Sequence, residues 1–260
     1  MEKQNKNFLR YVNHSYNERV NYETFIPLLI EETKSRFVKS ENSPFLNFET
    51  GNVLIGVRGI SIIKNKVVLN DDSFDKFNDI LFNIYPGGKS WGSRVVTIDP
   101  GNVSVKTLEK YGIIEGEART EEGLYLVKIG THHGHEAFNQ ASDFKFRRDK
   151  DGNHIWSNDD PVFRGKIGLN IHAQGTKKEN VGVSSLGCTV TKATWEDSEW
   201  IELISVFKAA QLRAKKENPH FTGFCYAVFN QSHDSTVSML PIWTLVRAGA
   251  IVDRWSSAII

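Results

Sequence analysis

Short apolar runs rich in β-branched and aromatic residues follow one another along most of the chain. In the first half they recur about every 12 residues, which is the spacing of strands in an antiparallel sandwich or barrel. The glycine, proline, asparagine and aspartate residues between them predict tight turns. The predicted strands cover residues 52–60, 66–69, 79–85, 94–98, 123–130 and 221–229.

Two segments predict helices that carry an apolar stripe. The first is expected to begin near Pro27, because proline suits a first helical turn, and to end near Ser40. The second is expected to follow Thr194, which has the spacing of a capping box with Asp197, and to end at Asn218. Its predicted core-facing stripe is Trp200, Leu203, Ile204, Phe207 and Leu212.

These patterns together predict an α+β fold dominated by β-structure. We expect a helical N-terminal appendage at residues 1–48 and one main domain at residues 49–260. The second predicted helix is expected to brace the turn at residues 184–188 against the sheet, and the mostly apolar segment 241–252 is expected to close the main domain.

The strongest chemical signal is one histidine followed by one cysteine. His172 ends an apolar run, and Cys188 follows the small-residue turn 184–187. A cysteine needs a nearby base to become a nucleophile at neutral pH, and histidine is the usual base. Gly187 allows a tight turn whose N–H groups stabilise the oxyanion of a reacting carbonyl. The alternative is that Cys188 is a small buried hydrophobic residue and His172 is structural.

The segment from His172 to the sequence Ser185-x-Gly187-Cys188 resembles the catalytic signature of the L,D-transpeptidase (YkuD-like) family. The resemblance covers about residues 120–195, and it is also similar to a phage-associated, cell-wall-lytic branch of such proteins. Leu186 stands where the family motif has a second histidine, the loop before it is slightly short, and Val190 replaces a frequent polar residue.

The resemblance implies a β-sandwich-like fold and specific roles for the residues of the motif. Cys188 would attack a peptide carbonyl of the peptidoglycan stem, and His172 would be its base. The N–H groups of Gly187 and Cys188 would hold the oxyanion, and Ser185 would support the turn. The backbone at Ala173 would orient the histidine, and Ala173 is also expected among the residues that bind the substrate. A neighbouring imidazolium is expected to lower the pKa of the Cys188 thiol.

A second group of polar residues is expected to line the substrate cleft. His132 and His133 follow a predicted strand, where alternation predicts that His133 and His135 share one face while His132 points away. Arg147 is a candidate for the carboxylates of a stem peptide. The alternatives for the histidines are an ordinary loop and a zinc site. No metalloprotease spacing supports zinc, so we predict neither a metal nor a cofactor.

Composition narrows the class of partner. The chain has 260 residues and a net charge of +1, which excludes the electrostatic footprint of a nucleic-acid-binding protein. Only two cysteines occur, and Cys225 lies in an apolar run expected to be buried. No run approaches the roughly 18 apolar residues of a membrane span, and residues 1–7 lack the apolar region of a secretory signal.

We therefore expect a protein made in the cytoplasm without a signal peptide that acts on the bacterial cell wall after release. The predicted function is a cysteine-dependent peptidoglycan peptidase of the lytic, endolysin-like kind, whose partner is the stem peptide. The alternatives are an L,D-transpeptidase that cross-links peptidoglycan, and a non-catalytic virion or wall-associated protein with the same fold. The sequence predicts no oligomeric state.

Overall fold

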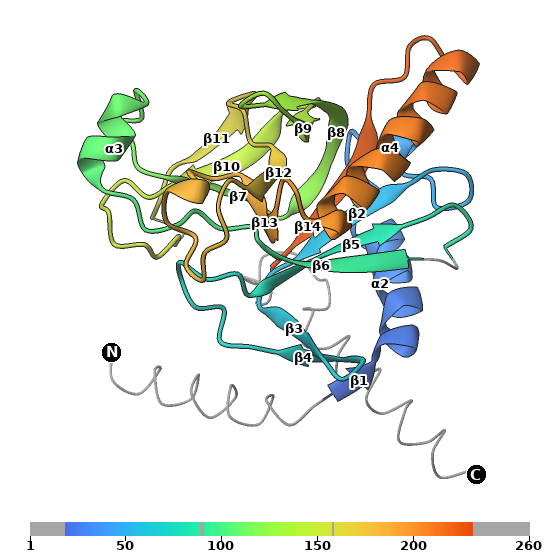
Figure 1. Cartoon of the computed structure of the whole chain (residues 1–260), viewed down its shortest axis with the longest axis horizontal. Coiled ribbons are helices and arrows are strands. Elements are labelled where there is room, and N and C mark those ends of the chain that lie inside the picture. Colours follow the sequence, from blue (N-terminus) through green and yellow to red (C-terminus); the bar gives the residue numbers. More distant parts are fainter. Residues whose placement is uncertain (1–18, 89–90, 158, 231–260) are drawn as a thin grey trace.

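An eight-stranded sheet whose strand order closes on itself forms the centre of the fold (Figure 1). The structure is a computed structural model that describes residues 19–88, 91–157 and 159–230. Around the sheet the order is β12-β13-β6-β5-β2-β14-β8-β9, and only the β12/β13 and β14/β2 pairs are parallel. The strands are β2 (Val53–Val57), β5 (Asp79–Ile84), β6 (Trp91–Thr97), β8 (Gly123–His132), β9 (His135–Gln140), β12 (Ile171–Gln174), β13 (Thr189–Thr194) and β14 (Phe224–Phe229).

Two three-stranded sheets lie beside the central sheet. One has the order β1-β4-β3 and the other has the order β11-β10-β7. The predicted run 52–60 is divided, because Gly59 adopts a positive φ of 67° and turns the chain between β2 and β3. The remaining elements are β1 (Arg19–Asn21), β3 (Ile60–Ile63), β4 (Lys66–Leu69), β7 (Ala118–Thr120), β10 (Phe144–Arg148), β11 (Val162–Gly165), α3 (Val105–Lys110) and the short helices η1 (Ser43–Phe45) and η2 (Gly182–Ser184). The predicted β-dominated α+β class is confirmed.

Helix α2 (Tyr22–Arg36) covers one face of the central sheet. Its buried residues Phe25 and Leu29 join a core cluster with alternate residues of β2, β5 and β14. The predicted start near Pro27 is wrong, because Pro27 lies inside the helix. The pairing of β1 with β4 fixes the chain just before the helix, which allows it to begin earlier. Helix and sheet thus share a core, while the domain boundary at residue 48 stays a prediction and residues 1–18 lie outside the described residues.

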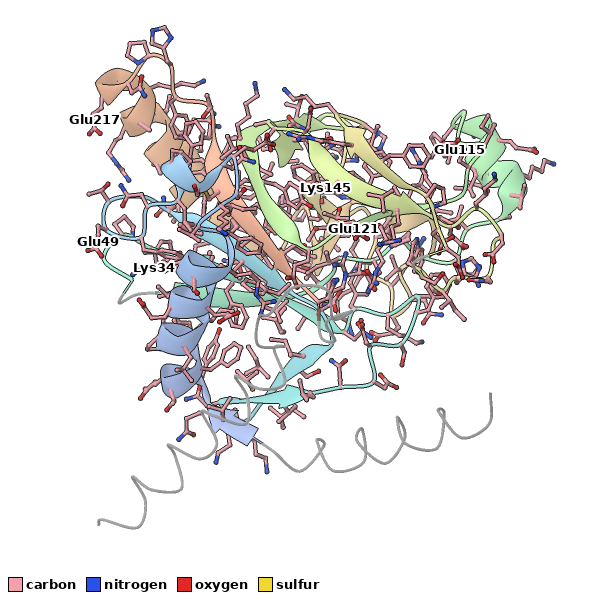
Figure 2. The ribbon with its side chains drawn as sticks, turned by 180° about the vertical axis from the view of Figure 1, so that it is seen from behind. Lys34, Glu49, Glu115, Glu121, Lys145 and Glu217 are labelled. Atoms are coloured by element: carbon pink, nitrogen blue, oxygen red, sulfur yellow. The ribbon has the colours of Figure 1, made fainter. Side chains whose placement is uncertain are left out.

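Helix α4 (Ser198–Glu217) covers the opposite face, as Figure 1 shows. Figure 2 labels Lys34 on α2 and Glu217 at the far end of α4. The helix begins after Asp197 rather than at Thr194, because residues 194–197 form a turn in which the Asp197 N–H donates to the Thr194 carbonyl at 3.2 Å. The Asp197 carboxylate accepts the Thr194 N–H at 2.8 Å, which is the bond that the acidic residue makes in the expected capping box. Four predicted stripe residues are buried, namely Trp200, Leu203, Ile204 and Phe207, whereas the prediction for Leu212 is wrong because that side chain is 59% exposed.

This second helix follows β13 and packs on the central sheet, so a helix after Cys188 is present as predicted, while its bracing of the cysteine turn stays a prediction. Cys225 is buried on the α2 side of the sheet, as expected. Within the described residues, no helix is long and apolar enough to cross a membrane. The segment 241–252, predicted to close the main domain, lies outside the described residues.

Candidate active site

The parallel pairing of β12 with β13 brings the predicted base and nucleophile to one face of the sheet. Ile171 pairs with Thr189 and His172 with Val190, and the Thr189 N–H donates to the Asn170 carbonyl at 2.9 Å. Continuing this register places Cys188 opposite Asn170. Since alternate residues of a strand share a face, the side chain of Cys188 projects on the same face as that of His172.

A glycine-dependent turn delivers the cysteine to this position. Gly187 has a φ of 137°, and a Cβ at this residue would lie 2.4 Å from the Ala118 carbonyl oxygen. Only glycine fits this backbone without strain. The Ala118 N–H donates to the Leu186 carbonyl at 3.2 Å, so the first residue of β7 holds the turn from outside.

The hydroxyl of Ser185 closes the same turn from within. It donates to the Cys188 carbonyl at 2.8 Å and accepts the Gly187 N–H at 3.1 Å. These are the contacts expected of a residue that supports the turn. The Gly187 N–H therefore already has a partner, and its predicted oxyanion role stays a prediction. The N–H of Cys188 makes no hydrogen bond within the described part of the chain and is the remaining donor.

His172 is held in one orientation by the backbone of its neighbour. Its Nδ1 lies 2.8 Å from the Ala173 carbonyl oxygen, which requires Nδ1 to carry the proton and leaves Nε2 as an acceptor. The side chain is buried, with 6% of the residue exposed. Burial lowers the pKa of His172 to about 4, the Ala173 hydrogen bond opposes this shift, and the adjacent His132 and His133 add to it. The imidazole is therefore neutral at pH 7.

Cys188 is half-buried and carries a neutral thiol. Its Sγ accepts the Asn170 N–H at 3.5 Å and donates to the Gly168 carbonyl at 3.5 Å. Burial raises the pKa of the thiol to about 11, and the Asn170 N–H only partly opposes this. The expected lowering of this pKa is wrong, because a neutral His172 offers no positive charge to a thiolate. Within the described structure the thiol and the His172 imidazole make no direct hydrogen bond.

The histidines after β8 form a hairpin rather than one alternating strand. His132 pairs with His135 across β8 and β9, and His133 with Gly134 makes a two-residue turn in which both have positive φ. The predicted facing is therefore wrong. The His132 ring lies 4.4 Å from the His172 ring, and the His133 ring lies 4.1 Å from that of His132. His132 thus adjoins His172 and His133 adjoins His132, and the role of both in substrate binding stays a prediction.

Two further residues at the site were not predicted from the sequence. Trp195 stacks beside His172 with ring centroids 5.7 Å apart, and it also stacks on His135 at 4.6 Å. Asn170 contacts Cys188 through its backbone and His132 through its side chain, with Nδ2 3.2 Å from Nδ1. Its position two residues before His172 on the same strand face was a usable signal for Asn170, whereas nothing local indicated Trp195.

Arg147 is occupied by contacts within the protein. Its guanidinium donates to the Glu121 carboxylate at 2.9 Å and to the carbonyls of Ser157 and Asp160 at 2.7 and 3.1 Å. A stem-peptide carboxylate would have to replace these bonds. The predicted role of Arg147 in substrate binding stays a prediction and gains no support from its surroundings.

The arrangement has the parts of an acyl-transfer site. It combines a thiol on a glycine turn, an imidazole with a fixed tautomer on the same face, and a backbone N–H beside the sulfur. The exposed loop 175–180 follows β12. The chain beyond this loop is anchored before β13, where the Asp75 carboxylate accepts the Gly182 N–H at 2.7 Å. Comparisons of this chain with known protein families, with curated proteins and with solved structures find no match.

Proposed function

We propose that the protein is a cysteine-dependent acyl transferase acting on bacterial peptidoglycan, in the form of a lytic peptidase that cleaves stem-peptide or cross-link bonds. One observation carries the proposal: Cys188 and a buried His172, pinned through Nδ1 to the Ala173 carbonyl, share one face of the parallel β12/β13 pair. The motif on these two strands supports an L,D-transpeptidase-like catalytic fold. The substrate class rests on this resemblance alone.

The first step is general-base attack by a neutral thiol. The Cys188 S–H turns from the Gly168 carbonyl toward Nε2 of His172, which takes the proton as sulfur bonds to the peptide carbonyl carbon. The π electrons of that carbonyl move to its oxygen, and the Cys188 N–H stabilises the resulting charge. An ion pair before substrate binding is not required, because proton transfer and S–C bond formation occur together.

The second step breaks the C–N bond. His172, now protonated at Nε2, gives this proton to the leaving amine as the tetrahedral intermediate collapses to a thioester on Cys188. Water then attacks the thioester in a hydrolase, while an amine from a second stem peptide attacks in a transpeptidase. Both reactions use the same residues, so the acceptor alone separates a lytic enzyme from a cross-linking one.

A second candidate is a non-catalytic virion or wall-associated protein with this fold. The observation in its favour is that the thiol and the imidazole are both neutral and make no direct hydrogen bond within the described structure. This candidate predicts binding to cell walls without covalent chemistry. In either case we propose that the protein reaches the bacterial wall after release from the cytoplasm.

Replacement of the nucleophile tests the proposal. Cys188→Ala should reduce the turbidity loss of purified sacculi by several orders of magnitude, because no thioester forms without the thiol. Cys225→Ala is the matched control, since it removes the other cysteine from a core position and should leave lysis in place. Mass spectrometry of the muropeptides identifies the bond, and thermal melts verify that both variants are folded.

The outcomes separate the three candidates. New cross-linked muropeptides without lysis would identify the transpeptidase. Lysis retained by a folded Cys188→Ala variant would refute the thiol mechanism. Wall binding by the wild-type protein, with no change in the muropeptides, would favour the non-catalytic protein.

A further inference from the structure

A second cluster of ionisable side chains lies away from the thiol and has no role in the proposed reaction. Glu117 immediately precedes β7, while Asp149 and His154 belong to the turn that follows β10. These residues line a cavity of about 290 Å³ together with residues of α3 and of the loop after it. Figure 1 shows α3 at one end of the molecule beside the β11-β10-β7 sheet, and Figure 2 labels Glu115 in the same region.

Glu117 places an unpaired carboxylate oxygen in this cluster. The residue is only 2% exposed, and its Oε1 has no hydrogen-bond partner. A buried polar atom without a partner costs free energy, and a buried carboxylate costs more than a neutral group. Among the described residues, the ionisable neighbours that surround this oxygen include a second carboxylate and one imidazole.

The carboxylate of Asp149 is held in a fixed orientation that suits a ligand. The residue is 1% exposed, its Oδ1 accepts the Asn153 N–H at 3.1 Å, and its Oδ2 accepts the His154 N–H at 2.9 Å. These bonds fix the direction of the carboxylate and leave lone pairs on both oxygens. The tight turn that makes them also carries the third member of the cluster.

His154 completes the set through an unpaired ring nitrogen. Its Nδ1 is buried, lies 3.3 Å from Oδ2 of Asp149, and makes no hydrogen bond. The ring stacks on Phe74 with centroids 4.3 Å apart and an interplanar angle of 16°, which fixes its orientation. The residue adopts a φ of 59°, a conformation that is uncommon for a residue with a side chain.

The backbone brings the two segments together. The Asp149 N–H donates to the Glu117 carbonyl at 3.1 Å. Gly116 has a φ of 81°, and a Cβ there would lie 1.8 Å from the Asp149 carbonyl oxygen, so glycine permits this close approach. The cluster is therefore a built site on two anchored segments, and not a chance meeting of surface side chains.

We propose that Glu117, Asp149 and His154 bind a divalent transition-metal ion of the zinc class. Their ligand atoms all lie within 4.8 Å of one another. In a tetrahedral site with bonds of about 2.1 Å, two ligand atoms stand about 3.4 Å apart, which matches the 3.3 Å between Nδ1 and Oδ2. An imidazole ligand favours zinc over Mg²⁺ and Ca²⁺, which prefer oxygen ligands.

This site connects to the candidate active site through one residue. Ala118 follows Glu117, its N–H holds the Leu186 carbonyl, and its own carbonyl lies against Gly187. A metal ion that ties Glu117 to Asp149 therefore stiffens the segment against which the cysteine turn packs. The inference itself is independent of the proposed function, because it concerns metal binding and stability.

Zinc titration of the full chain tests the proposal. After treatment with a chelator, the wild-type protein should bind one Zn²⁺ in calorimetry, and its melting temperature should rise with Zn²⁺ but not with Mg²⁺. Glu117→Gln and His154→Asn should each weaken binding at least about tenfold. Asparagine is chosen at residue 154 because it tolerates a positive φ.

Two variants serve as matched controls. Glu109→Gln removes a carboxylate that lines the same cavity outside the cluster, and His133→Asn removes a histidine of similar positive φ from the hairpin near His172. Both should bind Zn²⁺ like the wild type.

X-ray absorption of the zinc-loaded wild type should show one imidazole and oxygen ligands. This measurement does not depend on whether any variant folds. No Zn²⁺ binding by the wild type, unchanged binding by folded Glu117→Gln and His154→Asn variants, or two or more imidazoles at the metal would overturn the proposal.

Discussion

The Cys188 site and the Glu117 cluster both contact the segment that contains Ala118. They differ in how their buried polar groups are hydrogen-bonded. Around Cys188 the thiol, the imidazole and the Ser185 hydroxyl all make hydrogen bonds to the backbone, and burial keeps the first two neutral. Around Glu117 a carboxylate oxygen and a ring nitrogen are buried without a hydrogen bond, and the ring nitrogen lies 3.3 Å from the Asp149 carboxylate. In the first region these side chains already have partners, whereas in the second the proposed cation supplies the missing partner.

The Cys188 site and the Glu117 cluster are recognised by different kinds of observation. The cysteine site is recognisable from residue types and local spacing, but its electrostatics differ from those of an activated thiol. The cluster has no sequence motif, yet its unpaired buried atoms indicate a ligand. Unsatisfied buried atoms within a cluster of ligand types therefore support the metal proposal without a motif. A matching motif alone does not give the protonation state.

The largest effect should come from His172→Gln. If His172 is the base, lysis of sacculi should fall by about 10² to 10⁴-fold, because glutamine cannot take the thiol proton. Iodoacetamide labelling of Cys188 should stay slow from about pH 5 to pH 9 in both proteins, since the thiol pKa of about 11 comes from burial. His172→Gln should therefore lower the lytic activity without changing the rate of Cys188 labelling.

His132→Gln is the informative comparison, because that ring lies 4.4 Å from the His172 ring. Its loss of activity should be smaller than that of His172→Gln. A greater loss would transfer the role of base to His132. A labelling plateau below pH 7 in the wild type would contradict the neutral pair and restore the ion-paired thiolate.

The local sequence pattern predicted a helix or strand correctly where the residues of that element determine its conformation. Strands 66–69 and 79–84 and the buried stripe of α4 follow from apolar alternation and helical spacing. The expected bond from the Asp197 carboxylate to the Thr194 N–H is present, but the predicted start of α4 was wrong because residues 194–197 form a turn and the helix begins only at Ser198. The start of α2 was wrong because the β1/β4 pairing outweighs the usual preference of Pro27 for a first turn.

Long-range pairing explains what the sequence did not predict. The order of the central sheet depends on parallel pairing of β14 with β2, whose residues are about 170 positions apart in the chain. The thiol pKa depends on burial by distant segments, and Glu117 meets Asp149 only in the folded protein. The His133–Gly134 turn is different, because a two-residue turn containing glycine is a local signal that was missed.

The neutral state of His172 predicts an acid-sensitive stability. Its pKa falls from about 6.5 in the unfolded chain to about 4 in the folded protein, so the unfolded state binds the proton more strongly. Stability should be full above pH 6.5 and should decrease by up to about 3 kcal/mol as the pH falls to about 4. Urea denaturation across this range measures the slope, which should be shallower in His172→Gln. An equal slope in that variant would mean that His172 is not buried in the neutral form.

The Glu117 cluster should respond to pH in the opposite direction, with the smallest effect. Burial raises the pKa of Glu117 above its ordinary value, so the folded protein holds this proton more strongly than the unfolded chain. In the presence of a chelator, stability should therefore decrease as the pH rises from the unfolded pKa through the folded pKa, by no more than about 1.4 kcal/mol per pH unit. Glu117→Gln should remove this decrease and Glu109→Gln should retain it.

Saturating Zn²⁺ should reverse the pH dependence of stability in the wild type, because the metal binds the ionised carboxylate and the neutral imidazole. The measurement is the urea midpoint at each pH with and without Zn²⁺, and a wild-type slope that Zn²⁺ leaves unchanged would show that the buried carboxylate has no metal partner.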